Sequence, residues 1–312
     1  ALLTRYSFGS SGSKAASIFV PVVNLGWYTI QAATYGHFVA QVFHMGQVGE
    51  GLCMAASAII MGIFAMFGIS AITILGYIAI PAIVFLSIAT AIRSLGVIGG
   101  VDALFSYLPA ANMPLFTGIT AVIGTWVLST ATCIADIMRY AKDTKTAISA
   151  TLTGLLGGNI LMIVCGAIAA IAMENSDLTV ILLGFGLVIP SLILMTTNIF
   201  TTNAANLYST SLNLSNAFKM ERKKMLAILL ALSALATLTK PYEIGFLFTF
   251  LNILGTVVPP LSGIILSDYF LVHKGSYAAY DKARFCKWNP VPWITWAISI
   301  ALVYMIPFGL PS

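Results

Sequence analysis

The stretch Asn198-Ile199-Phe200-Thr201-Thr202-Asn203 lies in the cytoplasmic half of an apolar segment that is long enough to span a bilayer. Two amides and two hydroxyls this close together are costly in hydrocarbon, because a polar group without a partner there has lost its water. Such a cluster is tolerated where it lines a cavity or holds an ion, so it predicts a functional site within the membrane. The alternative is that these side chains only hydrogen-bond to neighbouring helices.

The composition around this stretch indicates an integral membrane protein. Of the 312 residues, 59% are hydrophobic and 8% are charged, and the mean hydropathy is +0.96. Soluble domains carry about 25% charged residues. Apolar runs of about 20 residues recur along the chain, which is typical of transmembrane helices and not of the alternating pattern of a β-barrel. We therefore predict an all-α membrane protein.

We expect a single polytopic membrane domain over residues 1–312, with about nine transmembrane helices. Their predicted ranges are 15–45, 51–70, 72–94, 114–141, 146–173, 185–209, 225–239, 244–272 and 290–309. If sides alternate from a cytoplasmic N-terminus, thirteen of the 15 Lys and Arg residues fall inside, and Arg93 and Lys240 fall outside. This bias follows the positive-inside rule. The basic charge thus orients the chain towards anionic lipid and does not indicate a nucleic-acid partner.

The segment from Pro114 to Tyr140 is predicted to be an interrupted helix. Gly118, Gly124 and a run of hydroxyls at 129–132 stand where a simple span would have large aliphatic residues. A broken helix frees backbone groups for a substrate or a coupling ion, as in secondary transporters. The alternative is an ordinary kink with close helix packing.

An aromatic residue and two amides share one face of the first predicted helix. Asn24, Trp27 and Gln31 are three and four residues apart, so their side chains project from the same side. A Trp between two amides can stack on a flat heterocycle while the amides bind its polar edge. Trp126 can supply the second face of such a sandwich. The alternative for a single Trp is packing or an interfacial anchor.

Other classes of function find less support. The chain has neither an H-E-x-x-H nor a G-x-S-x-G element, so we predict no catalytic residues and no enzyme. The four cysteines lack the spacing of a metal or redox motif. A channel stays a remote alternative, because the polar residues gather in one region and do not line a continuous path.

Several motifs together resemble the nucleobase:cation symporter-1 family, and within it the bacterial cytosine permeases. They are Arg5-Tyr6-Ser7-Phe8-Gly9, Gly26-Trp27-Tyr28, Ala135-Asp136-Ile137-Met138-Arg139-Tyr140, the Asn198–Asn203 stretch, Pro259-Pro260-Leu261-Ser262-Gly263 and Ser267-Asp268-Tyr269. The resemblance spans the whole chain and implies the inverted-repeat fold of the leucine transporter (LeuT). It also implies an incomplete fold, from about family helix 3 to helix 11, so we expect a piece of a longer protein.

The resemblance also implies a set of site residues. For the substrate these are Asn24, Trp27, Gln31, Trp126, Ser129 and Asn203, and for a sodium ion they are Asn198, Thr201 and Thr202. Asn24 stands where the cytosine permeases have Gln. Between Trp126 and Asp136 the chain has one residue more than the family pattern, which leaves the register at Ser129 open.

The expected function is secondary active transport. The resemblance implies import of cytosine or a related pyrimidine or purine across the bacterial cytoplasmic (inner) membrane, by sodium-coupled symport with alternating access. Alternative substrates are a hydantoin, allantoin or a thiamine-precursor pyrimidine, with protons as the alternative coupling ion. We expect a monomer that uses no cofactor other than sodium. Neutral oxygens suit a hard cation such as sodium without burying a carboxylate.

Overall fold

The computed structural model describes residues 4–67, 69–109, 114–122, 134, 137–175, 178–278, 280 and 282–305. Within these ranges the regular structure is helical and holds no strand. The helices are α1 (Thr4–Val42), α2 (Gln47–Met66), α3 (Ile69–Ile98), α4 (Val101–Phe105), α5 (Leu115–Val122), α7 (Thr144–Leu152), η2 (Thr153–Gly158), α8 (Asn159–Met173), α9 (Leu178–Gly184), α10 (Val188–Phe218), α11 (Arg222–Thr237), α12 (Ile244–Val257), α13 (Pro259–Ser267), η3 (Asp268–Val272) and α14 (Pro290–Met305).

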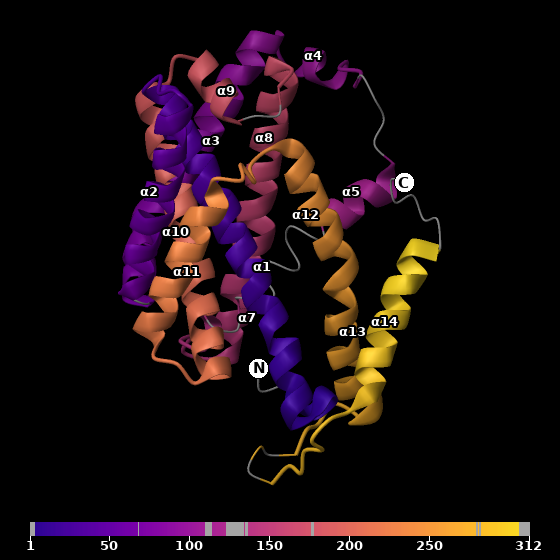
Figure 1. Cartoon of the computed structure of the whole chain (residues 1–312). Coiled ribbons are helices and arrows are strands. Elements are labelled where there is room, and N and C mark those ends of the chain that lie inside the picture. Colours follow the sequence, from indigo (N-terminus) through magenta and orange to yellow (C-terminus); the bar gives the residue numbers. More distant parts are fainter. Residues whose placement is uncertain are drawn as a thin grey trace.

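The main core lies between α1, α2, α10 and α11, which pack on one another, with α3 against α10 and α8 against α3 (Figure 1). The core is built from large apolar side chains, among them Tyr28, Phe38, Met61, Leu207 and Leu229. Gly36 allows the close approach of α1 to α2, because a Cβ at this position would overlap the backbone of Met54.

A second group of helices, α12, α13 and α14, lies beside this bundle (Figure 1). Prolines 259 and 260 stand at the start of α13 and separate it from α12. A small apolar cluster of Val23, Trp27, Leu251, Leu254 and Val258 joins α12 to α1. The predicted helix 244–272 is therefore divided into α12 and α13, because proline cannot donate the hydrogen bond that would continue α12, and it ends in the π-helical turn η3.

Four helical stretches of the described chain are long and apolar enough to cross a membrane: Gln47–Met66, Ser70–Ile98, Thr144–Met173 and Ile244–Val272. Many large apolar side chains on them are exposed, for example Phe85 at 73% and Leu271 at 77%. Exposed apolar surface of this extent suits a lipid environment. The chain is a multi-pass membrane protein.

The two longest helices extend beyond the predicted ranges. α1 begins at Thr4, well before residue 15, and turns at Gly9, whose φ of 81° is easily adopted only by glycine. α10 continues past residue 209 to Phe218. Its last turns carry polar residues such as Thr210 and Ser211, which are buried against other helices and not in lipid. Hydropathy therefore starts α1 too late and ends α10 too early.

Candidate functional site

The predicted stripe on α1 faces the inside of the molecule. Asn24 is fully buried, Trp27 is 8% exposed and Gln31 is half-buried. The Nε1 atom of Trp27 and the Oε1 atom of Gln31 are buried, and neither has a hydrogen-bond partner among the described residues. A buried polar atom of this kind is costly unless something binds it. The stripe thus offers one donor and one acceptor that a polar ring can use.

Phe250 of α12 covers Trp27 from the side. The two ring centroids are 5.5 Å apart and the planes cross at 82°, an edge-to-face contact. Gly26 makes room for it, since a Cβ there would come within 2.7 Å of the Phe250 ring. Phe250 is not among the site residues that the sequence predicts. The glycine directly before Trp27 is a signal for close approach by another element, but it does not identify which residue approaches.

Asn203 of α10 reaches α1 next to this stripe. Its side chain is fully buried, and Nδ2 donates to the backbone carbonyl of Tyr28 at 3.1 Å and contacts Sδ of Met61 at 3.2 Å. No partner of Oδ1 is present among the described residues. The bond joins α10 to the turn of α1 that contains Tyr28, the residue after Trp27, although Asn203 is far away in sequence.

The hydroxyls of Thr201 and Thr202 both donate to the carbonyl of Asn198, at 2.9 and 3.0 Å. Thr201 also donates to the carbonyl of Thr197 at 2.9 Å. These are the bonds that threonine makes in an ordinary helix, and each hydroxyl keeps lone pairs that can bind a cation. The sodium role of Asn198, Thr201 and Thr202 therefore stays a prediction.

Two predicted substrate residues, Trp126 and Ser129, lie outside the described residues. The predicted second aromatic face and most of the predicted interruption after Gly118 lie outside them as well. Within the described part of the chain, the candidate site thus consists of the α1 stripe, Asn203 and the side chain that covers Trp27, Phe250.

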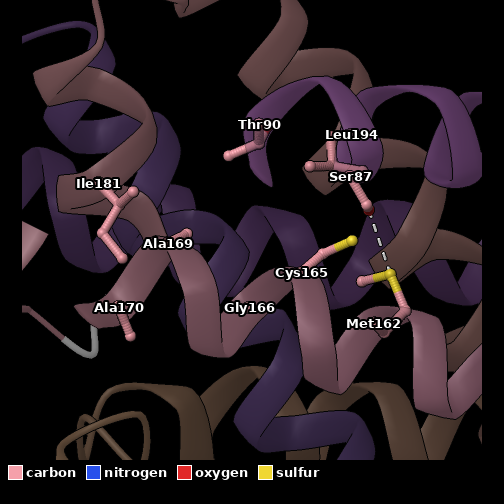
Figure 2. Close-up of a pocket in the computed structure, with 9 residues that line it drawn as sticks. All are labelled: Ser87, Thr90, Met162, Cys165, Gly166, Ala169, Ala170, Ile181 and Leu194. Atoms are coloured by element: carbon pink, nitrogen blue, oxygen red, sulfur yellow. Dashed lines mark hydrogen bonds between the residues drawn. The ribbon is translucent and has the colours of Figure 1, made fainter. Parts of the chain in front are cut away.

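A separate cavity of about 230 Å³ lies between α3, α8, α9 and α10 and contains none of the predicted site residues (Figure 2). Its wall is mainly apolar, with Met162, Cys165 and Ile181. The Ser87 hydroxyl contacts Sδ of Met162 at 3.2 Å, and Thr90 donates to its own helix at 2.8 Å. With both hydroxyl protons engaged and a mainly apolar wall, this cavity offers little to match the donors and acceptors of a nucleobase.

Comparison with known proteins identifies the family of the chain. The sequence profile of a family described as "Permease for cytosine/purines, uracil, thiamine, allantoin" matches residues 1–309. The cytosine permease of Escherichia coli (strain K12) is 29% identical over 310 residues, which is 99% of this chain and 72% of that protein. The hydantoin permease of Microbacterium maritypicum is 27% identical over 223 residues, 63% of this chain and 45% of that protein.

A solved structure shares the fold. It is MHP1, a nucleobase-cation-symport-1 family transporter in a closed conformation with bromovinylhydantoin bound, and it superposes with a TM-score of 0.80 at 19% identity. The match covers 99% of this chain and 74% of that one. The predicted fold class, an all-α transporter of the LeuT type, is confirmed, and the chain is a transporter and not an enzyme. The chain belongs to the family of permeases for cytosine/purines, uracil, thiamine and allantoin.

Proposed function

We propose that this permease imports a nucleobase, cytosine or a related pyrimidine or purine, across the bacterial cytoplasmic membrane. Support comes from buried polar atoms without partners in the described structure: Nε1 of Trp27, Oε1 of Gln31 and Oδ1 of Asn203. All three belong to uncharged side chains, and one is part of an aromatic ring. A neutral, planar ligand with donors and acceptors on its edge matches this set.

Transport proceeds by sodium-coupled symport with alternating access, and the protein acts as a monomer. The sodium ion binds at Asn198, Thr201 and Thr202, whose oxygens are neutral and suit a hard cation. The two hydroxyls lie on the same helix as Asn203. An ion held there can order the part of α10 that presents the amide to the substrate, which couples ion binding to substrate binding.

A hydantoin is the second candidate substrate, because a hydantoin permease is among the similar proteins. Asn24, which stands where the resemblance leads us to expect Gln, is one methylene shorter. The shorter side chain leaves more room beside Trp27, so we expect tolerance of a ring larger than cytosine.

The experiment that tests this function is a binding assay on the purified full-length protein. Cytosine, uracil, adenine, a hydantoin and allantoin are titrated with sodium and again with choline in its place. We expect micromolar to millimolar binding of a nucleobase that sodium strengthens. Binding of none of these bases would contradict the proposal, and equal affinity in choline would contradict the sodium coupling. Asn213→Ala, a half-buried residue later on α10, is the matched control for Asn203→Ala.

A further inference from the structure

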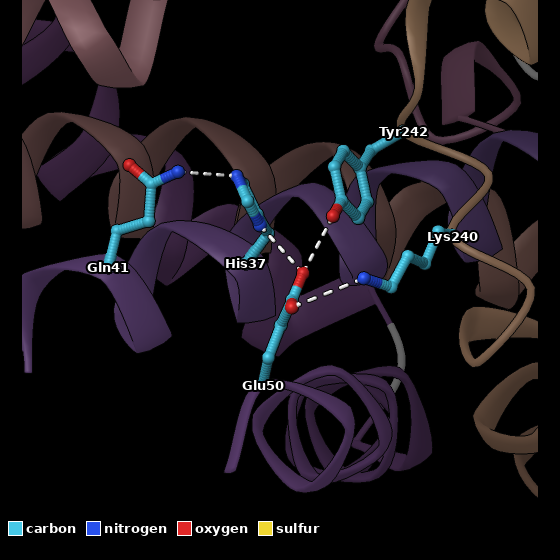
Figure 3. Close-up of polar contacts among 5 residues, drawn as sticks. All are labelled: His37, Gln41, Glu50, Lys240 and Tyr242. Atoms are coloured by element: carbon cyan, nitrogen blue, oxygen red, sulfur yellow. Dashed lines mark hydrogen bonds and ion pairs between the residues drawn. The ribbon is translucent and has the colours of Figure 1, made fainter. Parts of the chain in front are cut away.

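A polar cluster joins three segments of the chain at the end of α1 that the charge distribution places outside the cell. His37 and Gln41 lie near the end of α1, Glu50 in the first turn of α2, and Lys240 and Tyr242 in the loop before α12. Figure 3 shows the five side chains pointing toward one another. We refer to these five residues as the outer cluster.

The carboxylate of Glu50 is the centre of the outer cluster. Its Oε1 accepts from the Tyr242 hydroxyl at 2.6 Å and faces Nδ1 of His37 at 2.8 Å. Its Oε2 lies 3.4 Å from Nζ of Lys240. The Glu50 side chain is 13% exposed, so it needs these partners to offset the loss of water. The carboxylate therefore ties the loop before α12 to both α1 and α2.

Both ring nitrogens of His37 have a partner. Its ring stacks on Tyr242 with centroids 4.3 Å apart, and its Nε2 lies 2.7 Å from the amide nitrogen of Gln41. An amide nitrogen only donates, so in this arrangement Nε2 accepts and Nδ1 carries the proton that points at Glu50. A half-turn of the Gln41 amide presents its oxygen instead, which can accept from a protonated ring.

The outer cluster is connected to the candidate site through α12. Tyr242 precedes the start of α12 at Ile244, and Phe250 on the same helix covers Trp27. Along α1 the distance from Trp27 to His37 is about 15 Å, at 1.5 Å per helical residue. α12 and the loop before it thus contact α1 at two places, a polar one at His37 and an aromatic one at Trp27.

We propose that the outer cluster is an external proton-binding site that holds α12, and with it Phe250, closed over Trp27. The importance of this closure rests on the proposed role of Trp27 in substrate binding. The bond from His37 to Glu50 is already charge-assisted by the carboxylate, and protonation of the ring turns it into an ion pair, which strengthens it further. It also places a cation on the face of the Tyr242 ring, a favourable contact.

The other charged groups around His37 do not reverse the strengthening that protonation brings. Lys240, the competing cation, contacts the other carboxylate oxygen, and its side chain is 39% exposed, so water screens its repulsion. The adjoining cavity of about 370 Å³ is also lined by His44, Met45 and Leu183 of α9. Histidine changes charge between about pH 5 and 8. An acidic exterior therefore strengthens the closure, and a neutral or alkaline exterior weakens it.

Distance measurement by electron paramagnetic resonance tests the closure directly. Spin labels are attached at Val48 and Phe246, which are 80% and 50% exposed at the starts of α2 and α12, after the native cysteines are replaced. We expect a narrow distance distribution at about pH 5.5 and a broader, longer one at about pH 8. Initial uptake of radiolabelled cytosine into proteoliposomes should be about 3- to 10-fold faster at the higher external pH.

Two histidine variants identify the responsible group. His37→Gln keeps a hydrogen-bonding side chain that cannot titrate, so it should remove the pH dependence of both the distance and the uptake. His44→Gln is the matched control and should keep both, because His44 lines the same cavity but has no hydrogen bond to Glu50 in the described structure. Tyr242→Phe keeps the stacked ring and removes one bond to Glu50, so it should loosen the closure at every pH.

The outcomes separate this proposal from the proposed function. A distance distribution that does not change with pH in the unmodified chain overturns the proton-binding site, and so does a pH response that survives in His37→Gln. A pH-dependent distance that is lost in His37→Gln supports it even if the protein binds none of the bases. In that last case only the proposed substrate class fails.

Discussion

The side-chain nitrogen of Asn203 donates a hydrogen bond of 3.1 Å to the backbone carbonyl of Tyr28, and thereby joins α10 to α1 beside Trp27. This bond fixes the orientation of a fully buried amide. With Nδ2 engaged, Oδ1 is the atom left to bind a ligand, and it has no partner in the described structure. Asn203 is therefore set up as an acceptor, which matches an amino or ring N–H group of a base.

Asn203→Ala should weaken cytosine binding and destabilise the protein together. Loss of a buried hydrogen bond costs about 1–3 kcal/mol when its partner is left unsatisfied, and the ligand loses its acceptor as well. We expect about a 10-fold or larger increase in Kd, measured by calorimetry, with a lower unfolding temperature. Met61→Leu removes only the sulfur contact of Asn203 and should keep the affinity. Unchanged affinity in a stable Asn203→Ala protein would limit this amide to a structural role.

Trp27 should contribute through its ring and, separately, through its Nε1. Base–aromatic stacking is worth about 1–3 kcal/mol, so Trp27→Ala should raise the Kd for cytosine about 5- to 150-fold. Trp27→Phe keeps an aromatic face but loses the buried donor, and should give an intermediate effect. Equilibrium binding on both variants measures the difference. If Trp27→Phe binds as weakly as Trp27→Ala, the N–H group and not the stacking dominates.

The sequence alone predicts the part of the site that local spacing determines. The stripe of Asn24, Trp27 and Gln31 depends only on helical geometry, and it faces the interior as expected. Phe250 could not be predicted, because it reaches Trp27 from a helix more than 200 residues away in sequence. Glu50 and Lys240 are 190 residues apart in the sequence, and only the tertiary fold brings them together.

The helices, too, are predicted from the sequence only where local composition determines them. Composition predicts membrane helices because lipid and water favour different residues. Composition places the end of α10 too early, because it treats polar residues such as Thr210 and Ser211 as exposed to water. In the structure both are buried, and their hydroxyls donate hydrogen bonds to backbone carbonyls. The break at prolines 259 and 260 is visible in the sequence as a motif, but only the structure shows α12 and α13 as separate helices.

Gly36→Ala should destabilise the packing of α1 on α2. The added Cβ would overlap the backbone of Met54, which cannot move as a flexible side chain can. Overpacking of this kind costs about 1–3 kcal/mol. Gly76→Ala on α3 is the control, because a Cβ there meets nothing within 4 Å. Thermal unfolding in detergent should show a lower midpoint for Gly36→Ala alone, and equal midpoints would mean that the two helices separate more easily than the structure indicates.

Tyr277 should make the segment that follows η3 sensitive to alkali. Its hydroxyl donates to Asp268 at 2.7 Å, and burial together with this carboxylate raises the pKa of Tyr277 to about 12. Because the folded pKa exceeds the ordinary value of about 10, the stabilisation is complete below pH 10 and is lost as the pH rises toward 12. Ultraviolet titration of tyrosinate, compared with Tyr277→Phe, measures this. Loss of the late-titrating group in the variant is expected, and an unchanged titration curve would assign it elsewhere.

Thr201→Val and Thr202→Val should abolish the effect of sodium on substrate binding. Valine keeps the shape of threonine but removes an oxygen, and α10 stays helical because both hydroxyls bond only within their own helix in the described structure. Binding linkage is reciprocal, so sodium should raise the affinity for cytosine by the same factor by which cytosine raises the affinity for sodium, about 5- to 150-fold.

Calorimetry with each ligand, alone and with the other saturating, measures both factors. The valine variants should retain weak binding of cytosine that does not depend on sodium. Thr197→Val is the matched control, because Thr197 also bonds to its own helix, at 2.7 Å, but is not among the predicted sodium ligands. If both valine variants keep full stimulation by sodium, the cation binds elsewhere and these hydroxyls serve only the packing of α10.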